Sequence, residues 1–510
     1  MHSGKLFATV AATVIAAVTG AVVVDRVVAA PPAAATEAEL GRYYGQHPNW
    51  VACGVQALDE VGAQCADITV PVNYAEPQGK TMTVAISRIA ATDPAQRRGV
   101  MLSNPGGPGG SGLDQFIRLL PAMTPEVRAG YDLIGMDPRG VGRSTPIDCG
   151  WTTGFGLQSA GVDGAGFAES VVTQGRLAAE CVANQGDRLS SISTRNTARD
   201  MDVVRGVLGQ ERINYFGTSY GTYLGAVYMQ MYPERSDRMV LDSAVDPVRY
   251  GAVGMMQDMG PANEAALDRW ADWAAARDGE YHFGGTRAQV RATVENLIRG
   301  AAEKPLRIGD FEVDEHWLPM LLFTVLDDAR NYPTTSAHVR LYLDAAAGRA
   351  VTPDPELAAS IDRMLNGKPE NMSAQMTIMC GDVGVPRDPS WYWRNIEAAR
   401  ATQPIFGAFA NNITPCAFWP APAEDPTTIG NALPALVIQA TGDTRTTYAN
   451  GVAMRKALTG SRLVTLENVD IHSVYGRYRN TCAWGAINTY FSDGTLPATD
   501  VTCRDDGSAN

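Results

Sequence analysis

Residues 215–222, with the sequence YFGTSYGT, restrict the possible folds of this chain more than any other stretch. Residues 213–216 favour a strand, and the apolar side chains at residues 223–231 recur at helical spacing, so residues 217–221 lie at a turn from strand to helix. A serine between two glycines in such a turn is held on a sharp bend that exposes its hydroxyl group. The segment therefore predicts a nucleophile elbow with Ser219 as the nucleophile.

A serine hydroxyl is a weak nucleophile at neutral pH and needs a general base, for which histidine is the usual residue. The chain has six histidines, and only His472 follows a predicted strand of the core, at residues 462–466. The others lie in the N-terminal leader, ahead of the core or in a predicted lid: His2, His47, His282, His316 and His338. His472 is therefore the predicted base.

An acid must orient that base, and Asp443 is the predicted residue. It follows an apolar strand at residues 433–440, so its carboxylate would emerge at the same edge of the sheet as Ser219. Asp470 is the alternative acid, but it lies two residues from His472 in the same loop and is less able to reach Nδ1. The chain order of serine, acid and histidine is typical of hydrolases whose nucleophile lies on a strand-to-helix elbow.

A glycine-rich loop at residues 104–112, NPGGPGGSG, follows a short apolar run and precedes a predicted helix. Glycines let the backbone approach a substrate carbonyl closely, and a loop at this place in such a hydrolase supplies an N–H group to the oxyanion hole. We therefore predict that the backbone N–H groups of Gly107 and of Tyr220, the residue after the nucleophile, stabilise the oxyanion.

The same loop also fits the dinucleotide-binding pattern G-x-G-x-x-G through Gly107, Gly109 and Gly112, with Asp132 or Asp137 as the acid that would bind the ribose. This alternative is disfavoured because the pattern does not open the first strand–helix–strand unit and because a proline stiffens the loop. No Lys-Ser or Lys-Thr follows the glycines, which excludes a Walker phosphate loop. We therefore favour the role in the oxyanion hole.

The chain divides into a core and an insertion. Core strands and helices are predicted within residues 36–246 and again within residues 425–510, the part that carries the acid and the base. At residues 247–424, helical periodicity dominates, joints rich in glycine and proline separate the helices, and no buried strand is evident. We interpret this region as an inserted helical lid.

Residues 1–35 are predicted to be a signal peptide. Lys5 precedes an apolar run at residues 6–24, and the alanines at residues 33–35 offer a cleavage site. The run is long for a signal peptide, so an uncleaved membrane anchor is the alternative. Both the signal peptide and the anchor predict a secreted or cell-envelope protein.

Eight cysteines behind an export signal indicate disulfide bonds in an oxidising compartment. Spacing alone leaves about 105 pairings open, although bonds between sequence neighbours are the least demanding. A zinc site is disfavoured because no C-x-x-C occurs and the histidines are scattered. The cysteines are Cys53, Cys65, Cys149, Cys181, Cys380, Cys416, Cys482 and Cys503.

Composition argues against one class of partner. The net charge is −13 and the sequence has no evident basic patch, so we expect no binding to nucleic acid. The apolar share of 45% is that of an ordinary globular protein.

Several motifs, taken in their order and spacing, resemble the secreted actinobacterial tripeptidyl aminopeptidases and their proline-iminopeptidase-like relatives, which are α/β-hydrolase serine peptidases. The motifs are NPGGPG from residue 104, DPRG from residue 137, GTSYGT from residue 217, LDSAVDP from residue 241, CAFWP from residue 416, and the closing segment around Asp443 and His472. Together they cover the chain from Trp50 almost to its end.

The resemblance implies an α/β fold of the α/β-hydrolase type, with a mostly parallel central sheet flanked by helices and an inserted helical cap domain. It implies a triad of Ser219, Asp443 and His472, no cofactor, and the release of short peptides, often tripeptides, from free N-termini. It also favours disulfides between sequence neighbours in all four pairs.

The sequence departs from the family pattern at several positions. Thr447 stands where proline is usual, and Ile471 and Ser473 stand where glycines flank the histidine, but these changes alter no reacting group. Gly110 stands where many relatives have an acidic residue, which bears on how a substrate amine is held.

An exopeptidase must bind a free ammonium group, and carboxylates in the lid cavity are suited to this. The candidates are Asp327, Asp328 and Asp382.

The expected function is therefore that of an exported serine exopeptidase that acts on peptides with a free N-terminus. We expect no stable membrane association once the leader is cleaved. Two alternatives remain open: a secreted esterase or lipase with the same triad, because the fold does not choose between amide and ester, and a non-catalytic binding protein on a hydrolase scaffold.

Overall fold

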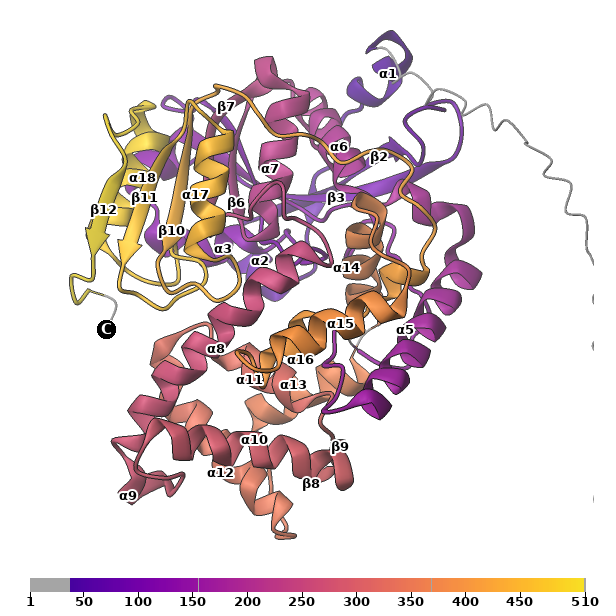
Figure 1. The fold of residues 1–510 in the computed structure, drawn as a ribbon. Coiled ribbons are helices and arrows are strands. Elements are labelled where there is room, and N and C mark those ends of the chain that lie inside the picture. Colours follow the sequence, from indigo (N-terminus) through magenta and orange to yellow (C-terminus); the bar gives the residue numbers. More distant parts are fainter. Residues whose placement is uncertain (1–36, 155, 368, 509–510) are drawn as a thin grey trace, which may run out of the picture.

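The computed structural model describes residues 37–154, 156–367 and 369–508, and Figure 1 shows how they are arranged. The predicted signal peptide or anchor at residues 1–35 lies outside the described residues. Among the helices that are described, none is long and apolar enough to cross a membrane.

A mixed sheet lies at the centre of the molecule, and its ten strands all fall within the described residues. They are β1 (Val51–Ala52), β2 (Gln64–Pro71), β3 (Thr81–Ile89), β4 (Gly99–Asn104), β5 (Tyr131–Met136), β6 (Ile213–Thr218), β7 (Ser236–Asp242), β10 (Ala435–Ala440), β11 (Arg462–Glu467) and β12 (Val501–Arg504). Their order is β1-β2-β3-β5-β4-β6-β7-β10-β11-β12. The pairs from β1 to β5 are antiparallel and all the following pairs are parallel, which confirms the predicted mostly parallel sheet.

Helices cover both faces of this sheet, and the strand sequences explain why. Successive side chains point to opposite faces, so Tyr215 of β6 and Leu241 of β7 belong to one hydrophobic cluster, whereas Phe216 and Val240 belong to another. The helices of the core are α1 (Glu37–Tyr44), α2 (Gln56–Glu60), α3 (Gln115–Leu119), α4 (Pro125–Gly130), α6 (Thr194–Val207), α7 (Tyr220–Met231), α17 (Tyr448–Ala457) and α18 (Thr481–Asp493). Every residue of β4, β6 and β10 is buried, so both faces of the sheet are covered at these strands.

The chain segment that connects β7 to β10 forms a group of helices, which lies to one side of the sheet in Figure 1. These are α8 (Gly254–Ala275), α9 (Asp278–Tyr281), α10 (Arg287–Glu303), α11 (Leu318–Val325), α12 (Tyr332–Ala346), α13 (Pro355–Asn366), α14 (Pro369–Asp382), α15 (Pro389–Ala399) and α16 (Phe406–Ala410). The hairpin of β8 (Leu306–Ile308) and β9 (Phe311–Val313) joins them. Short 3-10 helices complete the chain: η1 (Leu120–Ala122), η2 (Gly186–Ser191), η3 (Pro233–Arg235), η4 (Ala329–Asn331) and η5 (Pro415–Phe418).

One helix from before the elbow packs with this helical group. Phe167 of α5 (Gly164–Gln185) shares a hydrophobic cluster with Tyr392 and Ile396 of α15. The lid is therefore built from residues on both sides of the elbow in the sequence.

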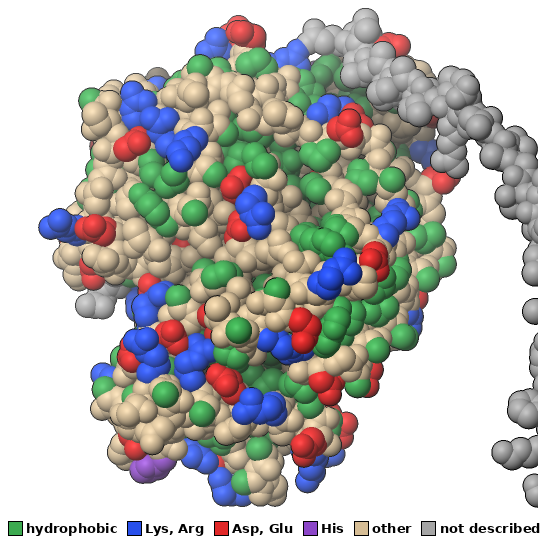
Figure 2. Space-filling model, in the orientation of Figure 1, with side chains coloured by type: hydrophobic (Ala, Val, Ile, Leu, Met, Phe, Trp, Pro, Cys, Tyr) green, Lys and Arg blue, Asp and Glu red, His purple; other side chains and the backbone are tan. Residues whose placement is uncertain are grey.

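The eight cysteines form four disulfides between sequence neighbours, which are Cys53–Cys65, Cys149–Cys181, Cys380–Cys416 and Cys482–Cys503. Cys380–Cys416 joins α14 to η5 within the lid, and Cys482–Cys503 joins α18 to the edge strand β12. On the molecular face shown in Figure 2, basic and acidic side chains are interspersed.

A fully buried ion pair fixes the turn that follows β5. The Arg139 guanidinium donates from Nε and Nη2 to the two carboxylate oxygens of Asp200 on α6, at 2.7 and 2.5 Å. Both side chains are 0% exposed. Arg139 also donates to the carbonyl oxygens of Ser191 and Val72, so its remaining N–H groups are satisfied.

Arg139→Met is expected to lower the free energy of unfolding by about 3–5 kcal/mol, because it leaves the Asp200 carboxylate buried without its cationic partner. Urea denaturation followed by circular dichroism measures the change. Arg97→Met is the matched control, since it breaks the more exposed pair of Arg97 with Asp132 and should cost at most about 1 kcal/mol. Equal losses in the two variants would contradict the role of the buried pair.

Candidate active site

Ser219 lies between the end of β6 and the start of α7, where the sequence places the elbow. It has a positive φ of 57°, which a non-glycine residue adopts only where the surroundings enforce it. The glycines permit this turn, because a Cβ on Gly217 would lie 2.4 Å from the carbonyl oxygen of Gly221 and a Cβ on Gly221 would lie 2.4 Å from that of Asn104.

The glycine-rich loop packs directly against the elbow. A Cβ on Gly106 would lie 2.6 Å from the carbonyl oxygen of Thr218, 2.8 Å from Cβ of Ser219 and 3.1 Å from the nitrogen of Tyr220. The loop and the N-terminus of α7 therefore border the same space, and the positive end of the helix dipole favours an anion there. The predicted oxyanion donors are Gly107 of this loop and Tyr220, the first residue of α7.

The two acids that the dinucleotide alternative would use to bind a ribose, Asp132 and Asp137, are already hydrogen-bonded to protein groups. Asp132 accepts hydrogen bonds from Arg97 and from the N–H of Ala91, and Asp137 accepts from Ser111 and from the N–H of Gly112. In the part of the chain that the structure describes, no group of three or more His, Cys, Asp or Glu residues is placed to hold a metal ion.

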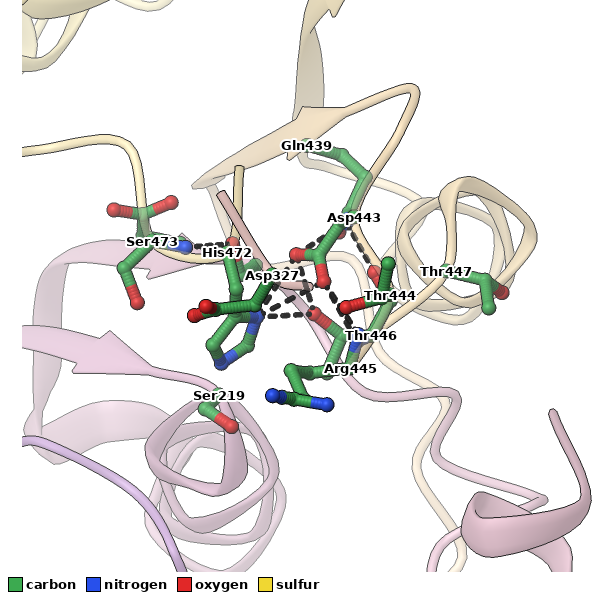
Figure 3. A network of polar contacts seen from close by, with 12 residues as sticks. Ser219, Asp327, Gln439, Asp443, Thr444, Arg445, Thr446, Thr447, His472 and Ser473 are labelled. Atoms are coloured by element: carbon green, nitrogen blue, oxygen red, sulfur yellow. Dashed lines mark hydrogen bonds and ion pairs between the residues drawn. The ribbon is translucent and has the colours of Figure 1, made fainter. Parts of the chain in front are cut away.

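His472 is paired with Asp443 (Figure 3). Its Nδ1 lies 3.0 Å from Oδ1 and 2.9 Å from Oδ2 of that carboxylate, whose side chain is 0% exposed. The carboxylate also accepts from the N–H groups of Arg445 (2.8 Å) and Thr446 (3.0 Å), from the Thr446 hydroxyl (2.9 Å) and from Gln439 (3.3 Å). These donors offset the cost of burying the charge and fix its direction.

The structure brings the three predicted catalytic residues together. In Figure 3, the imidazole of His472 turns Nδ1 to Asp443 and its other edge toward Ser219. The alternative acid points elsewhere, since the carboxylate of Asp470 accepts from Arg269 (2.5 Å) and Tyr332 (3.4 Å) of the lid.

The lid contacts the histidine loop directly, which the sequence did not reveal. The N–H of His472 donates to the carbonyl oxygen of Asp327 at 3.1 Å, and Arg477 donates both to the carbonyl oxygen of His472 (2.7 Å) and to the Asp327 carboxylate (2.8 Å). Burial raises the pKa of Asp327, but Arg445 and Arg477 outweigh it and hold that pKa below its usual value. The segment at Asp327, between α11 and α12, is thus bonded to the histidine loop.

Arg445, like Arg477, is a residue that the sequence patterns did not single out. Its guanidinium extends from the loop of the acid toward Ser219 in Figure 3, and it donates to the carbonyl oxygen of Phe323 and to Asn263. Burial lowers the pKa of Arg445 to about 10, so it remains a cation at neutral pH.

All three candidate acids for a substrate amine already bind protein groups, since the Asp327 carboxylate accepts from Arg477 at 2.8 Å. Asp382 is buried, accepts from the N–H and hydroxyl of Thr194 (both 2.6 Å) and from Tyr250 (2.8 Å), and has a pKa that burial raises to about 6. Asp328 is bound by Arg330 at 2.7 Å. Asp327 is the one of the three whose backbone contacts His472.

Comparison with known proteins gives consistent results along nearly the whole chain. A family model described as the alpha/beta hydrolase fold matches residues 99–470, which confirms the predicted fold class. A tripeptidyl aminopeptidase of Streptomyces lividans is 35% identical over 482 residues, which cover 89% of this chain and 86% of the relative.

Two mycobacterial relatives carry other names. Carboxylesterase B of Mycobacterium tuberculosis is 32% identical over 505 residues, 93% of this chain and 95% of the relative. Serine protease Hip1 of the same species is 27% identical over 489 residues, 90% of this chain and 91% of the relative.

Proposed function

Because this chain belongs to the alpha/beta hydrolase family, as a serine hydrolase related to tripeptidyl aminopeptidases, we propose that it is an exported exopeptidase that releases short peptides, mainly tripeptides, from free N-termini. The observation that carries the proposal is the pairing of His472 with the buried Asp443 next to the serine elbow. Export is supported by the four disulfides, which form in oxidising compartments.

The proposed reaction passes through an acyl-enzyme. Ser219 Oγ attacks the scissile carbonyl while Nε2 of His472 takes its proton, and Asp443 holds the imidazole in the tautomer that this transfer needs. The N–H groups of Tyr220 and Gly107 stabilise the oxyanion. The imidazolium then protonates the leaving amine, and a water activated by the same histidine hydrolyses the ester.

We assign the recognition of the substrate amine to Asp327. Asp327 and Arg477, which pair with each other, both line a cavity of about 530 Å³ between lid helices α11, α12 and α13, a size suited to a short peptide. The carbonyl oxygen of Asp327 is bonded to the N–H of His472, so the acid lies at the junction of this cavity and the base. A peptide ammonium bound there would limit how many substrate residues fit between the N-terminus and the scissile bond.

A substrate panel tests the proposal. The purified protein is incubated with chromogenic tripeptide amides, the same peptides with acetylated N-termini, and short acyl esters. We expect turnover of the free tripeptide amides and a loss of at least about tenfold in kcat/KM on acetylation, because the charge-assisted contact is removed. Cleavage of blocked peptides or of esters alone would contradict an aminopeptidase.

Asp327→Asn is expected to raise KM for free tripeptide amides by roughly 10- to 100-fold, as for a lost hydrogen bond to a charged group. The kcat/KM for a short ester, which has no ammonium, should change much less. Asp328→Asn is the matched control on the neighbouring residue, whose carboxylate is bound by Arg330. Equal effects of Asp327→Asn on peptide and ester would assign the ammonium to another acid.

An esterase is the second candidate function, favoured by the 32% identity to the protein named carboxylesterase B. The same triad would hydrolyse an ester by the same steps, because amide and ester differ only in the leaving group. The ester arm of the panel therefore decides between the two.

A further inference from the structure

We propose that Asp242 is a positioning residue that holds the backbone of the nucleophile and the loop of the general base in a fixed relation. The inference rests on the proposed triad of Ser219, Asp443 and His472, and not on the identity of the substrate. Asp242 would act through His472 without touching the reacting atoms.

The position of Asp242 suits this role. It is the last residue of β7, the strand that lies between β6, which leads to the nucleophile, and β10, which leads to the acid. The residue is 0% exposed. Its carbonyl oxygen accepts a hydrogen bond from the N–H of Ser219 at 3.0 Å, which fixes it to the elbow.

The side chain of Asp242 binds the loop that follows the base. The N–H of Tyr475 donates to its carboxylate at 2.8 Å, and the N–H of Val474 donates to the two oxygens at 3.1 and 3.0 Å. The hydroxyl of the next residue, Ser243, accepts from the N–H of Ser473 at 2.8 Å. The N–H groups of the three residues that follow His472 therefore all donate to the side chains of Asp242 and Ser243.

A carboxylate is a costly group for this place if its role is packing alone. Burial raises the pKa of Asp242 to about 6, although the N–H groups of Tyr475 and Val474 and the nearby His472 oppose the shift. A neutral acceptor would avoid the cost of a buried charge. The Asp242 carboxylate interacts electrostatically with His472, so it stabilises the positive charge that the imidazole acquires when it accepts the proton of Ser219.

Other charged groups also face His472. Asp443 binds Nδ1 from the loop after β10. On the lid side, Asp327 is paired with Arg477, and Arg445 extends from the loop of the acid.

The test is the isosteric variant Asp242→Asn, which removes the charge and one of the two acceptor oxygens. We expect kcat to fall on the order of 100-fold with KM within about threefold, because the base loop shifts relative to the nucleophile while substrate contacts remain. The acid limb of the pH–rate profile should move to lower pH, because the positive charge that forms on the imidazole loses a nearby anion. The kinetic constants and the pH–rate profile are measured by hydrolysis of a p-nitrophenyl ester, and the pH dependence also by the rate of labelling with a fluorophosphonate probe.

Two further variants separate positioning from stability. Asp202→Asn is the matched control: this aspartate of α6 is also fully buried, but its carboxylate binds Arg205 and Tyr44, so stability should fall while kcat and the acid limb stay unchanged. Ser243→Ala removes one anchor of the loop without a change in charge. It should lower kcat several-fold with an unmoved acid limb, and it keeps the proposal testable if Asp242→Asn does not fold.

The proposal is overturned if folded Asp242→Asn retains wild-type kcat, or if Ser243→Ala retains it when Asp242→Asn is unfolded. It is also overturned if kcat falls equally in Asp242→Asn and Asp202→Asn with no shift of the acid limb. Failure of the triad has a different signature, because the wild-type protein would then not be labelled, or Ser219→Ala would be labelled as well.

Discussion

Ser219→Ala is expected to lower kcat on the order of 10⁶-fold, because the acyl-enzyme route is lost and only the oxyanion hole and substrate binding remain. KM should change little, since the hydroxyl contributes to chemistry more than to ground-state binding. The fold should persist, because alanine meets the same φ requirement as serine at this elbow. Turnover of the preferred substrate measures the loss, and labelling by a fluorophosphonate probe should disappear with it.

Ser190→Ala is the matched control for this experiment. Ser190 is an exposed serine whose hydroxyl donates to the carbonyl oxygen of Asp187, and the variant should be labelled and turn over substrate like the wild-type protein. Labelling that survives in Ser219→Ala would locate the nucleophile at another residue. A folded wild-type protein that is not labelled would favour the non-catalytic scaffold.

Asp443→Asn is expected to lower kcat by roughly 10⁴-fold at neutral pH with a small change in KM. The amide would present either its oxygen or its NH₂ group to Nδ1 of His472, and in the second case the imidazole adopts the tautomer that cannot accept the serine proton. The N–H groups of Arg445 and Thr446 that now bind the carboxylate would also compete for the single remaining oxygen. Steady-state kinetics on the preferred substrate measure the effect.

Asp470→Asn is the control for the choice of acid. The two aspartates are the alternatives that the sequence leaves for the base, but Asp470 is bound by Arg269 and Tyr332 of the lid. Its amide variant should keep kcat within about tenfold of the wild type, because no contact to the imidazole is lost. A larger loss in Asp470→Asn than in Asp443→Asn would reverse the assignment of the acid.

The elbow could be predicted from the sequence because its constraint is local. The positive φ of Ser219 and the close approach of Gly217 to Gly221 lie within five consecutive residues, so the pattern itself carries the information. The base was found by elimination among few histidines, and the acid by its place after a strand of the same sheet edge. The structure brings these side chains together, and their catalytic roles stay predictions until the variants are measured.

The lid was predicted as helical from its periodicity, but its composition and contacts were not. Phe167 of α5 joins the lid although it precedes the elbow in sequence, because its ring packs against Trp393 and shares a hydrophobic cluster with Tyr392 and Ile396 of α15. The hairpin of β8 and β9 escaped notice because each strand has three residues, too few for a period of two to be recognised.

The sequence by itself predicted the nucleophile elbow and the sheet that carries it, and the family resemblance favoured disulfides between neighbouring cysteines. The elbow and the sheet depend on a short motif and on runs of apolar residues, which a linear chain records directly. Only the tertiary structure decided which buried groups hold the site together. Asp242 and Val474 are 232 residues apart in the chain, and their contact depends on the register of β7 between β6 and β10. The same holds for Asp327 against His472, since a hydrogen bond between distant segments is set by packing geometry and leaves no local pattern in the sequence.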